Sequence, residues 1–260
     1  MSRNKFKLLG YSIEQGIISK RKISLYSSSL LNMFKNSSSE IKKFLENNNY
    51  KNAWKSKDFS KLIVKFRKQY PDKFSKIYND IKLNPHFLSV ANDSKVLSKA
   101  KSILGIKKKN LWVGEFTGRI DVPGDKRNIL GWHIDASYYK NLSKTGSGAL
   151  VSWIALCDVK IKNGAIKICP KSHENESFKT KKTLYKPDSV LNSKKSITYK
   201  IENKIIRQYK QKYIELLAGD VIFFDLRLIH RSGFNSSNEV RLSILNRIFD
   251  KTAPGWIGKN

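Results

Sequence analysis

Residues 131–139 read GWHIDASYY, and this stretch carries the first sign of a metal site. One residue separates His133 from Asp135, so on an extended strand both side chains would point to the same face of the sheet. An imidazole and a carboxylate brought together in this way can supply two ligands of a facial triad, which holds non-heme Fe(II) and leaves its other coordination positions open. The stretch therefore predicts an iron site if a second histidine reaches it.

A second histidine with suitable surroundings ends the run GDVIFFDLRLIH at residues 219–230. A turn followed by an apolar strand would deliver His230 at the end of that strand. Of the four histidines in the chain, His230 is thus the best candidate for the third ligand. We predict that His133, Asp135 and His230 form the metal site and the catalytic centre.

An arginine follows in an otherwise apolar stretch, VRLSIL at residues 240–245. A loop at residues 233–238, rich in Gly, Asn and Ser, would join the two strands and bring Arg241 near His230. No carboxylate in the same strand is placed to neutralise this guanidinium, and an unpaired charge inside a protein is costly. We therefore expect an anionic ligand beside Arg241, with Ser243 facing the same way and adding a hydrogen bond.

The sequence around these residues is typical of short β-strands separated by Gly, Pro, Asn and Asp turns. The expected strands cover residues 111–114, 118–122, 149–154, 165–169, 196–201, 213–217, 221–228 and 241–249. Many short strands after a run of helices indicate an antiparallel barrel or a double-sheet jelly roll. The predicted fold class is therefore mainly β with an N-terminal helical region.

The first hundred residues show mostly helical periodicity. Serines before Glu40 are typical of a helix start, and we expect further helices over residues 58–69, 72–81 and 94–104, the last ending at Gly105. Residues 1–36 have no clean period, and residues 26–29 resemble a loop.

We divide the chain into three parts. These are a helical region (1–107) that packs on the core, a β core (108–250) and a C-terminal tail (251–260). A Lys-rich insertion at residues 173–212 is either a lid over the site or, as is more common for such stretches, a solvated excursion.

The formal net charge of +30 would suit a nucleic-acid-binding protein. However, only ten of the 51 basic residues are Arg, and abundant Lys, Asn, Ile and Ser are typical of an AT-rich genome. We therefore expect no nucleic-acid partner, and we expect the positive field to favour an anionic small-molecule substrate. The two cysteines lie in apolar runs, as in a reduced cytoplasmic protein, and no apolar run is long enough to span a membrane.

Three stretches resemble the phytanoyl-CoA dioxygenase family of Fe(II)/2-oxoglutarate oxygenases. They are WHID at residues 132–135, NGAIKICPKSH at residues 163–173, and the run from residue 219 through HRSGFNSS to Arg241. The resemblance covers about residues 108 to 250 and implies a double-stranded β-helix, the cupin-like form of the jelly roll. It also implies Fe(II) as the metal, with 2-oxoglutarate and O2 as co-substrates.

The same resemblance assigns further roles. His133, Asp135 and His230 would be the metal ligands, and Arg241 would bind the distal carboxylate of 2-oxoglutarate. Ser232 matches a serine that contacts 2-oxoglutarate. Trp153 matches a tryptophan that lines the co-substrate pocket, although it is equally well read as a core aromatic.

One departure and one retention bear on the reaction. The family often has Gln where this chain has Ile134, so a pocket contact is lost, but this side chain would point away from the metal. Related halogenases lack the carboxylate ligand, so the presence of Asp135 favours hydroxylation or another oxidation over halogenation. The alternatives are a non-oxygenase cupin-like isomerase or sugar-binding protein, which has no need of Arg241, and an oxygenase directed at nucleic acid, which only the charge favours.

Overall fold

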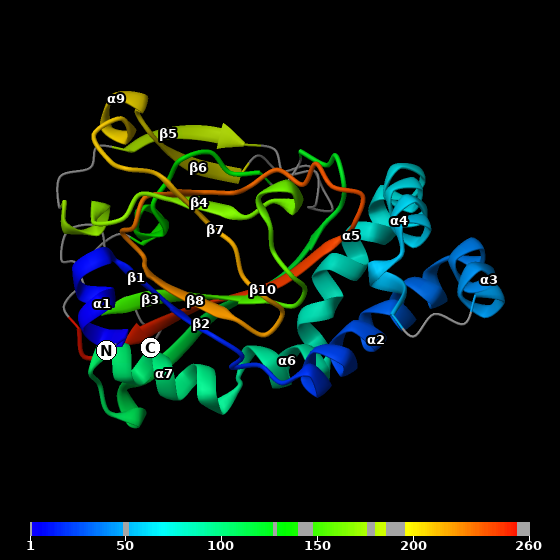
Figure 1. Ribbon diagram of the computed structural model, residues 1–260, viewed down its shortest axis with the longest axis horizontal. Helices are drawn as coiled ribbons and strands as arrows, with labels where there is room; N and C mark the ends of the chain where they lie inside the picture. The colour runs from blue at the N-terminus through cyan, green and yellow to red at the C-terminus, as the bar shows by residue number, and fades with distance from the viewer. Residues whose placement is uncertain are drawn as a thin grey trace.

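The computed structural model describes residues 2–48, 52–126, 129–139, 148–175, 180–185 and 196–253. Two antiparallel sheets lie one above the other, and the helices cover the outer side and one end of the larger sheet (Figure 1). The larger sheet has the order β1-β8-β3-β10-β2, the smaller has the order β7-β4-β9, and β5 and β6 form a hairpin. The strands are β1 (Tyr11–Glu14), β2 (Leu111–Asp121), β3 (Ala149–Ala155), β4 (Ile166–Ile168), β5 (Thr180–Tyr185), β6 (Ser196–Ile201), β7 (Lys212–Ile214), β8 (Val221–Asp225), β9 (His230–Arg231) and β10 (Arg241–Asp250).

The strands β3 and β8 of the larger sheet are buried on both faces, which explains their nearly continuous apolar sequences. Every residue of β3 is buried, and alternate residues enter different cores. Val151 and Trp153 join Ile166 and Ile168 of the smaller sheet in an inner core between the sheets. The intervening residues of β3, such as Ile154, join the helices in an outer core. The inner core is the layer in which the predicted site residues lie.

The helices are stabilised by capping hydrogen bonds and by the packing of their apolar faces in the hydrophobic cores. They are α1 (Ser2–Leu9), α2 (Lys20–Ser37), α3 (Ser39–Asn47), α4 (Lys57–Gln69), α5 (Pro71–Asp80), α6 (Pro85–Ala91), α7 (Ser94–Leu104) and α9 (Asn203–Ile206). Ser38 caps α3 by accepting the Ile41 amide, and Gly105 ends α7 in the left-handed region, both as predicted. The four predicted helices therefore agree with the structure to within about two residues.

The prediction of a loop at residues 26–29 was wrong. These residues lie within α2, which begins after Ser19, whose hydroxyl accepts the Lys22 amide. Tyr26, Leu30 and Phe34 recur at a spacing of about one turn, and all three side chains are fully buried. Serines between them disfavour a helix only slightly, so the burial of this stripe outweighs their propensity.

Several strand boundaries also differ from expectation. The stretches predicted as two strands at 111–114 and 118–122 form the single strand β2, which pairs with β10 across a register shift near Arg247. We did not predict β1, which pairs with β8 at one edge of the larger sheet. The N-terminal region therefore contributes a strand to the β core as well as helices.

The described part of the Lys-rich insertion at residues 173–212 contains the strands β5 and β6 and the helix α9. Its last residue, Lys212, begins β7. The described residues of the predicted tail are 251–253, and the rest of that tail lies outside the described ranges.

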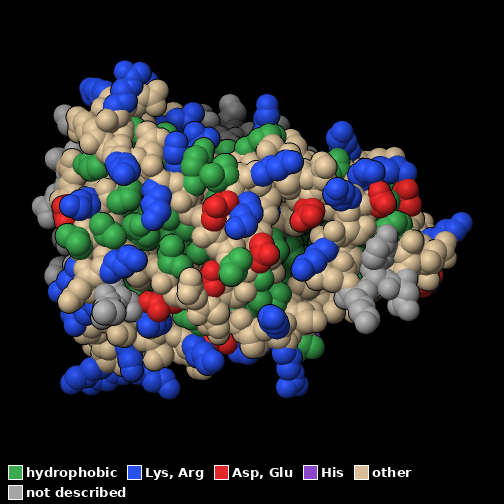
Figure 2. All heavy atoms as spheres, viewed as in Figure 1, with side chains coloured by type: hydrophobic (Ala, Val, Ile, Leu, Met, Phe, Trp, Pro, Cys, Tyr) green, Lys and Arg blue, Asp and Glu red, His purple; other side chains and the backbone are tan. Residues whose placement is uncertain are grey.

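Basic side chains are spread over the face of the molecule drawn in Figure 2, interspersed with acidic and apolar ones. They do not form the continuous stripe that a phosphate backbone would follow on that face. In the described part of the chain, no helix combines the length and apolar character needed to cross a membrane.

The side chain of Asn246 in β10 attaches the end of α6 to the larger sheet. Its side-chain amide donates to the Ala91 carbonyl at 2.7 Å, where α6 ends and carbonyls lack partners within the helix. Asn246→Ala should lower the free energy of unfolding by about 1–3 kcal/mol, because the buried carbonyl loses its donor. Urea unfolding of the metal-free protein measures this, and a change under about 0.5 kcal/mol would show that the contact does not matter.

Candidate metal centre

His133 and His230 are brought together by a backbone bridge. The His133 amide donates to the His230 carbonyl at 3.0 Å, and the His230 amide donates back to His133 at 3.0 Å. Residues paired in this way lie directly opposite each other, so their side chains share a face. The two imidazole centroids are 4.2 Å apart, and both side chains are almost fully buried.

Both imidazoles are oriented by carbonyl groups. Nδ1 of His133 lies 2.7 Å from the Gly131 carbonyl oxygen, and Nδ1 of His230 lies 3.0 Å from that of Leu228. A carbonyl only accepts, so each Nδ1 carries the proton and each Nε2 presents a lone pair. Metal-binding histidines are commonly held by such outer contacts.

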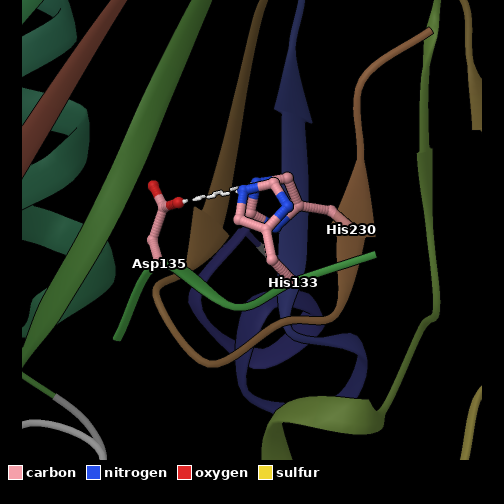
Figure 3. A group of neighbouring side chains, drawn as sticks. All are labelled: His133, Asp135 and His230. Carbon is pink, nitrogen blue, oxygen red and sulfur yellow. Dashed lines mark ion pairs between the residues drawn. The ribbon is translucent and has the colours of Figure 1, made fainter. Parts of the chain in front are cut away.

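Asp135 completes the group. The backbone is extended at Ile134, which points Asp135 to the same side as His133, although the expected strand is reduced to the isolated bridge. Asp135 instead begins the 3-10 helix η4 (Asp135–Tyr138). Its Oδ1 lies 3.4 Å from Nε2 of His133 and 3.8 Å from Nε2 of His230 (Figure 3). The structure thus brings all three predicted ligands together.

The donor set fits a divalent metal ion. One atom from each of the three residues lies within 4.8 Å of the others, and all three residues are buried. Two neutral nitrogens and one carboxylate oxygen on one side of a point are the arrangement that non-heme Fe(II) takes. Few other functions would justify the burial of a carboxylate beside two imidazoles whose lone pairs face it.

Burial and neighbouring charges set the ionisation of the site. Burial opposes the ionisation of Asp135, but the Arg247 guanidinium at 3.0 Å, together with His133 and His230, holds the pKa of Asp135 well below its usual range. Burial, reinforced by His133, lowers the pKa of His230 to about 4. The group is therefore ready at neutral pH to accept a cation without first releasing a proton from these two residues.

Arg241 has a protein partner that its own strand did not reveal. Asp121, opposite Arg241 in the neighbouring strand β2, accepts a hydrogen bond from its Nη2 at 2.6 Å and another from Arg119 at 2.6 Å. Burial opposes ionisation of Asp121, but the two arginines hold its pKa well below the usual range. The charge of Arg241 therefore does not by itself require a bound anion, and the anionic ligand beside it stays a prediction.

A tight turn brings a carbonyl to the same guanidinium. Gly164 adopts a φ of 97°, a region that favours glycine, and its carbonyl oxygen accepts a hydrogen bond from Nη1 of Arg241. The Arg241 guanidinium also lies 5.5 Å from the centroid of the Trp153 ring. Trp153 is buried in the inner core, and its ring lies beside the Arg241 guanidinium.

Two polar atoms on this face of β10 have no partner among the described residues. Nε of Arg241 and Oγ of Ser243 are both buried and make no hydrogen bond there. Ser243 is two residues from Arg241 and shares its face, as predicted. Ser232, by contrast, is engaged in a loop contact, because its hydroxyl accepts the Leu130 amide at 3.3 Å.

The insertion meets the ligand-bearing loop. The Tyr138 hydroxyl donates to Thr198 of β6 at 3.2 Å, and its ring lies edge-on to Tyr199 at 5.3 Å. The Ile201 amide of β6 also donates to the Trp132 carbonyl at 3.0 Å. The β5–β6 hairpin therefore packs beside the segment that carries His133 and Asp135.

The profile of the family described as phytanoyl-CoA dioxygenase (PhyH) matches residues 35–243 of this sequence. The chain belongs to the phytanoyl-CoA dioxygenase family. The match contains all three residues of the candidate metal centre and Arg241. We find no match among curated proteins.

Solved structures share the fold at low sequence identity. The epimerase SnoN, in complex with Fe3+, α-ketoglutarate and nogalamycin RO, aligns with a TM-score of 0.59 and 17% identity over 98% of this chain and 86% of its own. EvdO2 from Micromonospora carbonacea var. aurantiaca, complexed with 2-oxoglutarate, aligns with a TM-score of 0.59 and 16% identity over 99% and 92%. The α-ketoglutarate-dependent carbocyclase SnoK aligns with a TM-score of 0.56 and 15% identity over 100% and 92%.

The burial of His230 predicts a pH effect on stability. In the unfolded chain, a histidine binds a proton below a pH of about 6.5, whereas folded His230 stays neutral down to about pH 4. The unfolded state then binds more protons, so stability falls as the pH drops through this window. Metal-free wild type should lose up to about 3 kcal/mol more than His230→Gln between pH 7 and 4. Urea unfolding at several pH values measures this, and parallel curves for the two proteins would contradict it.

Proposed function

We propose that this protein is an Fe(II)/2-oxoglutarate-dependent dioxygenase that acts on a small molecule. The convergence of His133, Asp135 and His230, with both imidazoles fixed through Nδ1, is the observation that carries the proposal. Membership of the phytanoyl-CoA dioxygenase family supports it. In this proposal, the two facing sheets are a double-stranded β-helix, as in the cupin-like jelly roll.

His133, Asp135 and His230 would hold Fe(II) through two Nε2 atoms and one carboxylate oxygen. When bound, iron and 2-oxoglutarate supply the oxidising chemistry, in which 2-oxoglutarate and O2 become succinate and CO2. The chain provides the rest: it orients the ligands and keeps water away from their buried side chains.

The 2-oxoglutarate would lie along the inner face of β10. On that face, Ser243 and Leu245 lie between Arg241 and Arg247, which contacts Asp135. Leu245 pairs with Trp153, so an apolar wall flanks this path. The unpartnered Nε of Arg241 and Oγ of Ser243 would receive the distal carboxylate. Asp121 would keep the rest of the guanidinium in place, and we retain Ser232 as a further contact.

The reaction itself is proposed as the hydroxylation of a C–H bond, because the carboxylate ligand Asp135 is present. Structures with this fold include an epimerase and a carbocyclase, so another oxidation of a C–H bond on the same metal centre is the second candidate. Both begin from the same residues and the same co-substrate.

Binding of the co-substrate is the first experiment. Anaerobic addition of Fe(II) and then 2-oxoglutarate should give the visible charge-transfer band of a chelated 2-oxo acid on iron. His133→Ala should abolish the band, because the metal loses one of three ligands. No band in wild type, or an undiminished band in His133→Ala, would refute the proposal.

Arg241→Ala should weaken 2-oxoglutarate binding by about 10- to 100-fold, because a charge-assisted contact of about 1.5–3 kcal/mol is lost. Titration of the same absorption band against 2-oxoglutarate measures the affinity. Arg207→Ala, which alters an exposed arginine of the insertion, is the matched control and should leave the affinity unchanged. Equal affinities for wild type and Arg241→Ala would show that Arg241 does not bind 2-oxoglutarate.

A further inference from the structure

The loop that carries Asp135 is attached to the larger sheet at two points. Asp135 Oδ2 accepts a hydrogen bond from Nε of Arg247 at 3.0 Å. Four residues later, the Tyr139 ring lies edge-on to Phe249 at 5.3 Å. Burial raises the pKa of the Tyr139 hydroxyl, and the negative charge of Glu115 adds to that shift. Arg247 and Phe249 are alternate residues on one face of β10, and they thus meet the two ends of η4.

Arg247 connects the two attachments. Its Nη1 donates to Glu115 at 2.7 Å while its Nε holds Asp135. Glu115 lies opposite Arg247 on the neighbouring strand β2. The four side chains Asp135, Arg247, Glu115 and Tyr139, here called the loop clamp, therefore run from the candidate metal ligand to the exposed edge of the sheet, where Glu115 is half exposed.

The loop clamp divides the two oxygens of Asp135 between different tasks. Oδ1 faces the imidazoles, and Oδ2 is occupied by Arg247. A carboxylate held in this way can bind a metal through one oxygen only. A carboxylate with both oxygens free can bind through both and would then take an additional coordination position. Since 2-oxoglutarate takes two positions as a chelate, such an extra bond would leave no position for O2 on an octahedral ion.

We propose that Arg247 is a positioning residue that restricts Asp135 to one metal bond, and that Glu115 and Tyr139 hold Arg247 and the loop in register. This inference rests on the proposed metal site and concerns how the site keeps its coordination positions free. Arg247 touches the ligand and not the reacting atoms, so it acts through Asp135.

Two effects of Arg247 on metal affinity have opposite signs. Its positive charge repels a nearby cation, so removal of the charge alone would strengthen metal binding. Its hydrogen bond orients the ligand, and loss of such an outer contact typically weakens metal binding by about 10- to 100-fold. If orientation of Asp135 is the larger effect, Arg247→Met binds the metal more weakly than wild type. If charge repulsion is the larger effect, Arg247→Met binds the metal more tightly.

The test uses Mn(II) and the full-length, metal-free protein. Titration of Mn(II) gives the affinity, and water-proton relaxation gives the number of water molecules on the bound ion. Arg247→Met should bind Mn(II) about 10- to 100-fold more weakly than wild type, because Asp135 loses the contact that orients it. The bound ion should also retain fewer waters, because Asp135 is then free to bind through both oxygens. Arg247→Lys keeps the positive charge, but a single ammonium group does not replace the two separate contacts of the guanidinium with Asp135 and Glu115. This variant should therefore also bind Mn(II) more weakly than wild type.

The matched control is Arg227→Met. Arg227 pairs with Asp225 at 3.3 Å, and its side chain is 12% exposed compared with 20% for Arg247. It contacts no candidate ligand, so its loss should leave both the affinity and the water count unchanged. Tyr139→Phe removes only the hydroxyl and should weaken Mn(II) binding by a smaller factor than Arg247→Met.

The outcomes separate this inference from the proposed function. Failure of wild type to bind Mn(II) would overturn the metal site and this inference with it. Normal binding by wild type with equal or tighter binding by Arg247→Met would overturn the role of Arg247 alone. An unchanged water count in Arg247→Met and Arg247→Lys would likewise overturn it. If Arg247→Met does not fold, Arg247→Lys and Tyr139→Phe decide the question by the same two readouts.

Discussion

The paired hydrogen bonds between the backbones of His133 and His230 are the constraint on which the candidate site depends. They join two segments that are far apart in the sequence, and they fix the distance and direction of both imidazoles. Because this pairing belongs to the fold, the entropy of ordering the two ligands is lost on folding and not when a metal binds. Asp135 then needs only one extended residue, Ile134, to reach the same point.

The sequence predicted those parts of the site that depend on local periodicity. A spacing of two placed Asp135 beside His133. The apolar run identified His230 as the third ligand, but its predicted position at the end of that strand was wrong. The strand β8 ends at Asp225, and His230 begins β9 in the smaller sheet. The pairing of Arg241 with Asp121 depends on the register between β10 and β2, which the spacing of residues within one strand does not determine. The roles of Arg119, Glu115 and Arg247 were missed for the same reason, although their charges in apolar strands were a signal.

At the level of the fold, long amphipathic helices and strands were predictable, and context-dependent elements were not. The helix α2 carries serines that disfavour a helix, and only its packing against the outer core makes it stable. The short strand β1 contains four residues and exists because β8 offers an unpaired edge. The charges at the inner face of β2 and β10 are balanced. Three arginines are paired with three carboxylates, namely Arg119, Arg241 and Arg247 with Asp121, Asp135 and Glu115. The formal net charge of +30 therefore comes from residues outside this group.

The position of β1 has a consequence for the order in which the chain can fold. Tyr11 of β1 pairs with Phe224 of β8, so β1 must wait for a partner that is synthesised about 200 residues later. At typical translation rates of about 5–20 residues per second, that delay is on the order of ten seconds or more. Such long-range pairing also slows folding itself, because a large loop must close before the contact forms. The segment that becomes β1 therefore stays unpaired while the helices after it can already assemble.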